Sequence, residues 1–282
     1  MHLKSIIMTL GGIGIGLLLA RGTTATANTH YLTGVKNHNF FITQRTLNLP
    51  KTKYKRALTI PKGTIVQAQG VSKINDKLTT HIYLNTLSYH LRHNYIGHGE
   101  RSTKSIALTT SNFKKVKVPQ YVKYYSTQLT YADNIGVNYT ADGNLYAGKQ
   151  YPKETDLLSA KAARITVTSD GYLEYYANTK VFSTIVDPKP TTSVKITKVT
   201  GPADGKTNLY TKQPVPNTIG KRISETGTAQ YVTTIKRLYR TYATVTATAR
   251  DKAETDSIDI SAGYQVNGKS YFMYQAIFFP EG

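Results

Sequence analysis

Short runs of β-branched and aromatic residues, separated by turn residues, occupy most of this chain after residue 39. Residues 40–49 and 57–68 have strand character, and Pro61-Lys62-Gly63-Thr64 interrupts the second run as a turn would. Residues 78–91 and 113–125 are also rich in the residue types that favour strands. The pattern predicts a first β unit whose final strand lies within 113–125.

Two dipeptides that end in glycine mark hairpins in the second half of the chain. Asp170-Gly171 lies in the middle of residues 164–176, and Asn267-Gly268 lies within residues 263–279. Both dipeptides accept the positive φ of tight turns, and strand-like residues flank each of them. We therefore expect two antiparallel hairpins at these positions.

Three other segments shape the expected organisation. Residues 231–250 are rich in Thr, Tyr, Val and Ile, which predicts a pair of strands rather than a helix. Residues 155–163 are the candidate for one short helix, with Thr155 or Asp156 as its N-cap. Asp187-Pro188-Lys189-Pro190 is a stiff break in the strand pattern.

These patterns predict an all-β protein. We expect a first β domain in residues 28–125, followed by one or two further antiparallel β domains in residues 126–282, which a break near 187–193 would divide. The 255 residues from 28 to 282 are enough for each such unit to bury a core of its own.

The first 27 residues have the pattern of a secretory signal peptide. His2 and Lys4 give a basic start, residues 6–20 form an apolar run, and Ala25-Thr26-Ala27 is a small-x-small cleavage site. A bilayer span needs about 20 apolar residues, which is more than this run provides. We expect export and release of a chain that begins at Asn28, with membrane contact only through the signal before cleavage. A retained membrane helix is the alternative.

Composition narrows the class further. The sequence has no Cys, so no disulfide, thiol nucleophile or cysteine-ligated zinc is available. A secreted chain without cysteine is typical of a bacterium that does not use disulfides. Hydrophobic content of 39% and charged content of 18% are those of a folded protein.

The net charge of +20 is unevenly distributed. Residues 28–125 contain 16 Lys and Arg against only Asp76 and Glu100, whereas residues 126–282 contain 18 Lys and Arg against 14 Asp and Glu. A strong positive field raises the local concentration of polyanions. Outside a bacterium these are wall phosphate polymers, anionic lipids and released nucleic acid. The alternative is that the charge only keeps a secreted protein soluble.

The segment from Arg56 to Val66, Arg-Ala-Leu-Thr-Ile-Pro-Lys-Gly-Thr-Ile-Val, is followed by a polar hairpin and an aromatic strand. It resembles the start of a bacterial SH3-like module and of the surface-layer wall-binding repeats of lactic acid bacteria. The resemblance covers about residues 42–121, with an insertion around residues 90–104. Such modules are small β-barrels that attach secreted proteins to the cell wall. The resemblance therefore implies a small SH3-like barrel in residues 28–125 and a secreted cell-surface protein. It carries over no individual ligand residue.

Basic residues interleaved with aromatics are the candidate ligand-binding set. Lysine attracts phosphate, while tyrosine offers a flat face and a hydroxyl to sugar rings. The alternative is that the lysines form a solvated face while the tyrosines and valines form the core. The candidate residues are Lys51, Lys53, Tyr54, Lys55, Arg56, Lys114, Lys115, Lys117, Tyr121, Lys123 and Tyr124.

Three histidines, His90, His93 and His98, are the only dense set of metal-ligand side chains. In an extended strand His90 and His93 would point to opposite faces, so chelation would need a turn between them. We expect no metal and no cofactor. The histidines are instead expected to enlarge the basic surface together with Arg92 and Arg101.

No set of residues indicates catalysis. Ser111-Asn112-Phe113-Lys114 has the Ser-x-x-Lys spacing of penicillin-binding enzymes, but it precedes a strand instead of opening a helix. We expect a secreted, non-catalytic, cell-wall-associated protein that docks electrostatically on anionic wall polymers or peptidoglycan. The alternatives are a cationic effector that binds anionic membranes or nucleic acid, and a metal-dependent wall hydrolase. No nucleic-acid-binding motif is present, so no specific nucleic-acid partner is expected.

Overall fold

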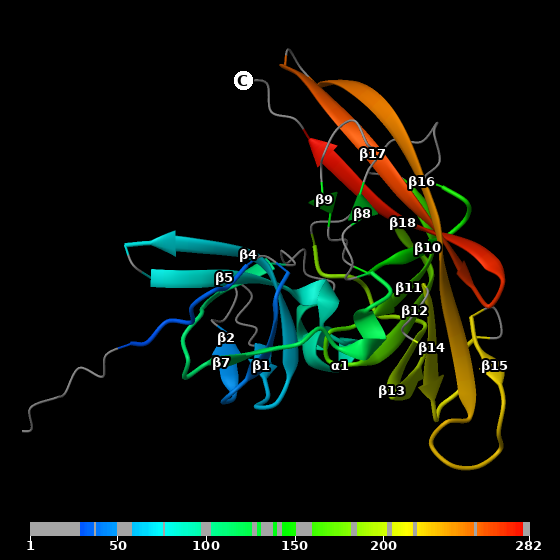
Figure 1. The fold of residues 1–282 in the computed structure, drawn as a ribbon, viewed down its shortest axis with the longest axis horizontal. Helices are drawn as coiled ribbons and strands as arrows, with labels where there is room; N and C mark the ends of the chain where they lie inside the picture. Colours follow the sequence, from blue (N-terminus) through cyan, green and yellow to red (C-terminus); the bar gives the residue numbers. More distant parts are fainter. Residues whose placement is uncertain are drawn as a thin grey trace, which may run out of the picture.

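The structure, a computed structural model, describes residues 29–36, 38–49, 58–75, 77–96, 103–125, 129–130, 138–139, 143–150, 160–181, 185–201, 205–216, 219–250 and 253–278. All strand pairs among these residues are antiparallel, and the helical segments are short. The prediction of an all-β fold is confirmed. The strands form an N-terminal sheet and a C-terminal barrel, which lie side by side in Figure 1.

The N-terminal sheet has five strands in the order β6-β5-β4-β1-β7, and β2 and β3 form a separate hairpin. The predicted turn at residues 61–64 joins β3 to β4, and Gly63 in it has a φ of +84°. The strands are β1 (Phe40–Thr43), β2 (Leu47–Leu49), β3 (Leu58–Ile60), β4 (Ile65–Ile74), β5 (Lys77–Tyr83), β6 (Thr103–Ala107) and β7 (Phe113–Val116).

Strand β1 is buried on both faces. Phe40 and Phe41 point to opposite sides of the sheet, because side chains alternate along a strand, yet they are only 2% and 0% exposed. Phe41 packs into the core of the N-terminal sheet with Leu58, Val66 and Phe113, whereas Phe40 belongs to the core of the barrel. The sheet is therefore packed between its own core and the barrel.

The barrel closes because β16 pairs with β17 and also with β14. Its eight strands follow the order β14-β13-β12-β11-β10-β18-β17-β16, while β15 adds to β16, and β8 and β9 form a separate pair. The strands are β8 (Leu129–Thr130), β9 (Asn138–Tyr139), β10 (Leu145–Ala147), β11 (Lys161–Val167), β12 (Tyr172–Lys180), β13 (Thr192–Thr200), β14 (Lys206–Thr211), β15 (Lys221–Arg222), β16 (Tyr231–Arg250), β17 (Ala253–Val266) and β18 (Lys269–Phe278).

Side chains fill the barrel, as is usual for eight strands. Inward residues such as Ile165, Leu209 and Ile235 are fully buried in one apolar cluster. Tyr124 and Tyr125, from the segment that follows β7, enter the same cluster. The Tyr264 hydroxyl donates a hydrogen bond to the Tyr124 carbonyl at 3.0 Å. The chain thus passes from the sheet into the barrel core before it reaches β8.

Both predicted hairpins are confirmed. β11 and β12 pair across Asp170-Gly171, and β17 and β18 pair across Asn267-Gly268. Residues 231–250, however, form one continuous strand instead of a pair. They contain no Gly, Pro, Asn or Asp that would favour a turn, and partners on both sides supply hydrogen bonds.

Three further expectations need correction. The strand expected over 78–91 ends at Tyr83, because the apolar residues that follow pack inward in helical turns: η1 (Leu84–Thr86), α1 (Tyr89–Arg92) and η2 (His93–Tyr95). Residues 161–163 of the expected helix begin β11, and residues 155–159 lie outside the described residues. The break at 187–190 does not separate two sheets, because β12 and β13 pair across it.

The segment of η1, α1 and η2 lies between the sheet and the barrel (Figure 1). On α1, Arg92 forms a fully buried ion pair with Glu174 of β12, with 2.7 Å between Nη2 and Oε2 and with both side chains 0% exposed. Arg92 also donates to the Leu87 and Asp187 carbonyls, each at 3.0 Å, and to the Tyr176 hydroxyl. Arg92 therefore has hydrogen-bond acceptors both in its own unit and in the barrel.

A second buried ion pair adjoins the first. Arg164 of β11 makes a two-point contact with the Asp187 carboxylate, at 2.6 and 3.1 Å, and its guanidinium lies over the Tyr176 ring. The Asp187 backbone N–H donates to Asn85 Oδ1 at 2.8 Å. We call Arg92, Glu174, Tyr176, Arg164 and Asp187 together the clamp.

The charge balance of the clamp follows from burial and pairing. Burial is the largest single influence on Arg92 and acts to lower its pKa, but Glu174, Tyr176 and Asp187 together outweigh it, so this pKa is raised. The pKa of Arg164 is raised as well, against the effect of burial and chiefly by the Asp187 charge, so both guanidinium groups keep their charge. Breaking one partner of such a pair is far more costly than replacing both with apolar residues, because it leaves an unpaired charge in the interior.

We expect Arg92→Met to lower the free energy of unfolding by about 3–5 kcal/mol, because the Glu174 carboxylate would lose its buried partner. Urea unfolding measures this change. Arg222→Met is the matched control, since Arg222 is 56% exposed and lies 3.8 Å from an exposed Glu225, and it should change stability by less than about 1 kcal/mol. Equal effects of the two substitutions would contradict the role assigned to the clamp.

A second prediction concerns Asp170, whose carboxylate accepts a hydrogen bond from the Ser88 N–H at 2.9 Å. Burial raises the pKa of Asp170 above its ordinary value, so folding takes up a proton, and stability falls as pH rises from about 3.9 through the raised pKa. Asp170→Asn keeps the acceptor oxygen but cannot titrate. Its stability relative to the parent should therefore rise across that interval and level off above it. Urea unfolding at a series of pH values measures this difference in the free energy of unfolding. A difference that stays constant with pH would contradict the prediction.

Candidate functional site

A groove of about 300 Å³ opens on the N-terminal sheet beside the β2–β3 hairpin. One wall is the segment from the end of β1 through β2, and the other comes from β6 and the turn before β7. The residues that line it are Arg45, Thr46, Leu47, Asn48, Leu49, Ser105, Ile106 and Asn112.

Asn112 holds the Arg45 side chain in place at this groove. Arg45 Nε donates to Asn112 Oδ1 at 2.9 Å, and Asn112 Nδ2 donates to the Ala107 carbonyl at 2.9 Å. The Asn112 carbonyl also accepts the Gln44 N–H at 2.8 Å, and its side chain is 7% exposed. Because these bonds fix the Asn112 side chain, its hydrogen bond to Nε orients the exposed guanidinium of Arg45. Its two Nη groups make no hydrogen bond to any described residue.

The charge around Arg45 is uncompensated in the described part of the sheet. Asp76 and Glu100, the two acids of residues 28–125, lie outside the described residues. Among the cations described in this range, Arg92 is buried in the clamp, and most of the others are exposed. An oriented guanidinium with free Nη groups suits a phosphate or carboxylate ligand.

The predicted basic residues do not all lie on one face of the N-terminal sheet. Lys114, Lys115, Lys117 and Lys123 are exposed, but Lys114 and Lys115 are consecutive in β7 and point to opposite faces. Lys115 Nζ donates to the Gly34 carbonyl at 3.0 Å. The remaining basic candidates and their tyrosine, namely Lys51, Lys53, Tyr54, Lys55 and Arg56, lie outside the described residues. They fall between β2 and β3, whose residues Leu49 and Leu58 pair.

The other two predicted tyrosines, Tyr121 and Tyr124, pack against the barrel. Tyr124 is 4% exposed, and its hydroxyl donates to the Gly143 carbonyl at 2.7 Å. Tyr121 is half-buried, and its hydroxyl donates to the Ser169 carbonyl at 2.7 Å. Tyr124 therefore presents no open ring to a ligand, because its ring is part of the apolar cluster. Tyr124 is therefore a core residue, which was the alternative to a ligand-binding role.

The histidines do not form a metal site in the described part of the chain. His93 Nδ1 lies 2.9 Å from the His90 carbonyl, and the His90 ring lies 4.8 Å from that of Tyr172. His98 lies outside the described residues, and no group of three or more metal-ligating side chains occurs among those that are described. The expectation that Arg92 enlarges the basic surface is wrong, because this side chain is fully buried.

Sequence reasoning missed Arg45. Residues 40–49 suggested one strand, whereas β1 ends at Thr43 and the chain turns at Gln44 and Arg45 before β2. The residue that orients Arg45, Asn112, is 67 positions away. No local pattern could have revealed this contact.

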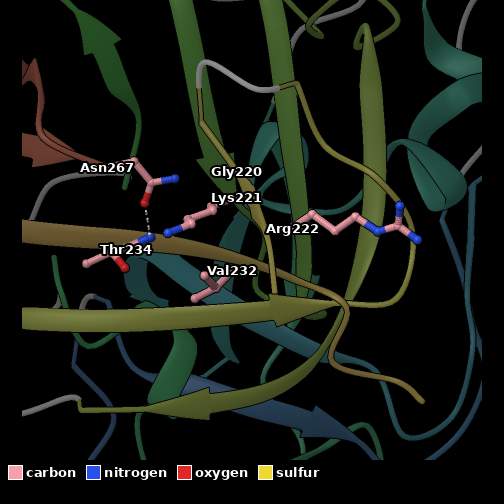
Figure 2. A pocket seen from close by; sticks show the side chains of 6 residues that line it. All are labelled: Gly220, Lys221, Arg222, Val232, Thr234 and Asn267. Atoms are coloured by element: carbon pink, nitrogen blue, oxygen red, sulfur yellow. Dashed lines mark hydrogen bonds between the residues drawn. The ribbon is translucent and has the colours of Figure 1, made fainter. Parts of the chain in front are cut away.

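A second hollow, of about 590 Å³, lies on the barrel (Figure 2). Asn267 forms one side of it. Its Oδ1 accepts the Thr234 N–H at 2.8 Å, and its Nδ2 donates to the Ile219 carbonyl at 3.0 Å. Figure 2 shows Lys221 directed toward Thr234 and Asn267, and Arg222 directed away from them.

No family model, curated protein or solved structure matches this chain. Among the described residues, no helix is long and apolar enough to cross a membrane.

Tyrosine ionisation tests the burial of Tyr124. Burial raises the pKa of Tyr124 well above its ordinary value of about 10. Its contribution to stability is therefore fully present below about pH 10 and is lost as pH rises from there through the raised pKa. With no Trp in the chain, phenolate absorbance reports tyrosine alone. We expect folded parent and Tyr124→Phe proteins to give the same absorbance rise near pH 10, and to differ by one tyrosine only after unfolding. An additional ionisation near pH 10 in the folded parent would show that the ring is accessible.

Proposed function

We propose that this chain is a secreted, non-catalytic, cell-wall-associated protein that docks electrostatically on anionic wall polymers or peptidoglycan. The observation that carries the proposal is Arg45, fixed by Asn112 at the groove with both Nη groups unpaired among the described residues. The exposed lysines of β7 and of the segment after it add charge to the same unit. Export rests on the signal-like pattern of residues 1–27.

The resemblance to SH3-like and surface-layer wall-binding modules supports the same assignment. We take the five-stranded sheet, together with the β2–β3 hairpin, as a module of this kind followed by the larger barrel. In support, the turn at residues 61–64 stands between β3 and β4 inside the segment that carries the resemblance, and the groove adjoins the same hairpin. The basic residues 51–56 fall between the two strands of the hairpin.

A flexible polymer fits the charge distribution better than a small anion. The exposed lysines are not focused on one point, since Lys114 and Lys115 point to opposite faces of β7. A polymer with a phosphate in each repeat can contact the oriented Arg45 and several lysines together, with affinity gained from the linked contacts. Contacts between exposed charges are screened by salt, so this docking should weaken as ionic strength rises.

The test is cosedimentation of residues 28–282 with bacterial walls, before and after teichoic acid extraction, across a salt series. We expect Arg45→Gln to weaken binding about threefold at low salt, as the loss of one exposed charge contact implies. Lys180→Gln is the control, because it removes one exposed charge from the end of β12 on the barrel. Binding that survives extraction and high salt would rule out charge-driven docking on wall phosphate.

The intact chain is the right material, because the clamp and the segment around Tyr124 bind the sheet and the barrel to each other. Adding vesicles of anionic lipid and duplex DNA as competitors separates the alternative ligands. Stronger binding to either competitor than to walls would favour the cationic effector over the wall protein.

A further inference from the structure

Among the barrel side chains that the structure describes, acids and cations are separated in space. Of the barrel acids whose side chains the structure describes, Glu174 and Asp187 are buried in the clamp, and Asp170 faces Ser88. Glu225 is the exposed one. Among the charged side chains described on the outside of the barrel, cations therefore outnumber acids.

The cations collect on one outer face because of strand register. In β14, Thr207, Leu209 and Thr211 point inward and are buried, so Lys206 and Tyr210 point outward. Residues directly opposite each other share a face, and Lys236 of β16 is opposite Lys206.

The same register adds two more lysines to this face. Lys198 of β13 is opposite Tyr210, and its ammonium lies 5.5 Å from the centre of that ring. Lys221 of β15 is opposite Val232, which is itself opposite Tyr210. We call this set the lysine face: Lys198, Lys206, Tyr210, Lys221 and Lys236.

One member of the lysine face, Lys221, borders a hollow. The hollow of about 590 Å³ in Figure 2 is lined by Lys221, Val232 and Thr234, which all point to this side of the sheet. Asn267 forms its far side. Its volume is within the range of sites that bind small organic groups. The Lys221 and Arg222 cations and the Thr234 hydroxyl around such a hollow suit a sugar or polyol that carries phosphate.

We infer that the lysine face is a second binding surface for phosphate-bearing polymers, separate from the Arg45 groove. The inference rests on the proposed function for its ligand class, and it assigns the barrel a role that the sequence left open. Four lysines spread over four strands can contact successive phosphates of one chain, which a single small anion cannot do. With the clamp joining the two units, one polymer or two neighbouring polymers could engage both surfaces.

The probe is long-chain inorganic polyphosphate, titrated into residues 28–282 at low salt. We expect Lys206→Gln/Lys236→Gln to weaken binding about tenfold, the combined effect of two exposed charge contacts. The matched control is Lys161→Gln/Lys180→Gln, which also removes two exposed lysines that are directly opposite each other, in β11 and β12. The control should weaken binding less than about twofold. Equal losses in both pairs would overturn the inference, because net charge alone would then explain binding.

A single substitution separates binding from folding. Lys206 and Lys236 are like charges directly opposite each other, which disfavours the pairing of β14 with β16. Lys236→Glu should therefore raise the thermal midpoint while it weakens polyphosphate binding. A fall in both quantities would overturn the inference, since it would make these lysines structural.

The two surfaces can fail independently in the wall assay. Loss of wall binding in Arg45→Gln with none in Lys206→Gln/Lys236→Gln would leave the proposed function standing and overturn the lysine face. The reverse result would support the lysine face and remove the groove from the proposed function.

Discussion

The buried ion pair between Arg92 and Glu174 is the constraint on which the arrangement of the sheet and the barrel depends. Two charges held out of water are tolerable only when each has its partner and its remaining hydrogen bonds. Here the guanidinium comes from the segment inserted between β5 and β6, and the carboxylate comes from the outer face of β12. Separation of the two units would leave both charges without partners, so the units fold against each other and share Phe40 and Tyr124 in one apolar cluster.

The clamp also shapes the surface. By holding Glu174 and Asp187 in its interior, it removes negative charge from the outside of the barrel. The lysines on β13, β14, β15 and β16 are then left without nearby carboxylates among the described residues, apart from Glu225 beside Arg222. An interaction that serves packing thus sets the electrostatic character of a face on the other strands of the same barrel. Counting charges along the sequence cannot show this, because it gives buried and exposed residues equal weight.

The sequence predicted the turns, because a turn depends on the residues within it. Asp170-Gly171, Asn267-Gly268 and the turn at residues 61–64 require special backbone angles, and the structure has turns at all three. Contacts between distant residues decided the rest. Residues 84–95 turn helical because they pack against the barrel, and Arg92 is buried there despite its charge. The Arg45 groove depends equally on Asn112, which is remote in sequence. The predicted lysines of β7 are exposed as expected, but alternation along the strand divides them between two faces.

The clamp gives a chain without cysteine a buried, non-covalent cross-link, which needs no oxidant to form. Arg92 and Glu174 are 82 residues apart, so their ion pair links distant parts of a chain that has no cysteine. An ion pair of this kind forms whenever the two units meet, regardless of redox conditions, and it re-forms after each unfolding without the risk of mispaired thiols. Because it is buried, salt screens it far less than it screens the exposed lysines. Salt concentrations that weaken the proposed docking on a charged polymer would therefore leave this internal ion pair intact.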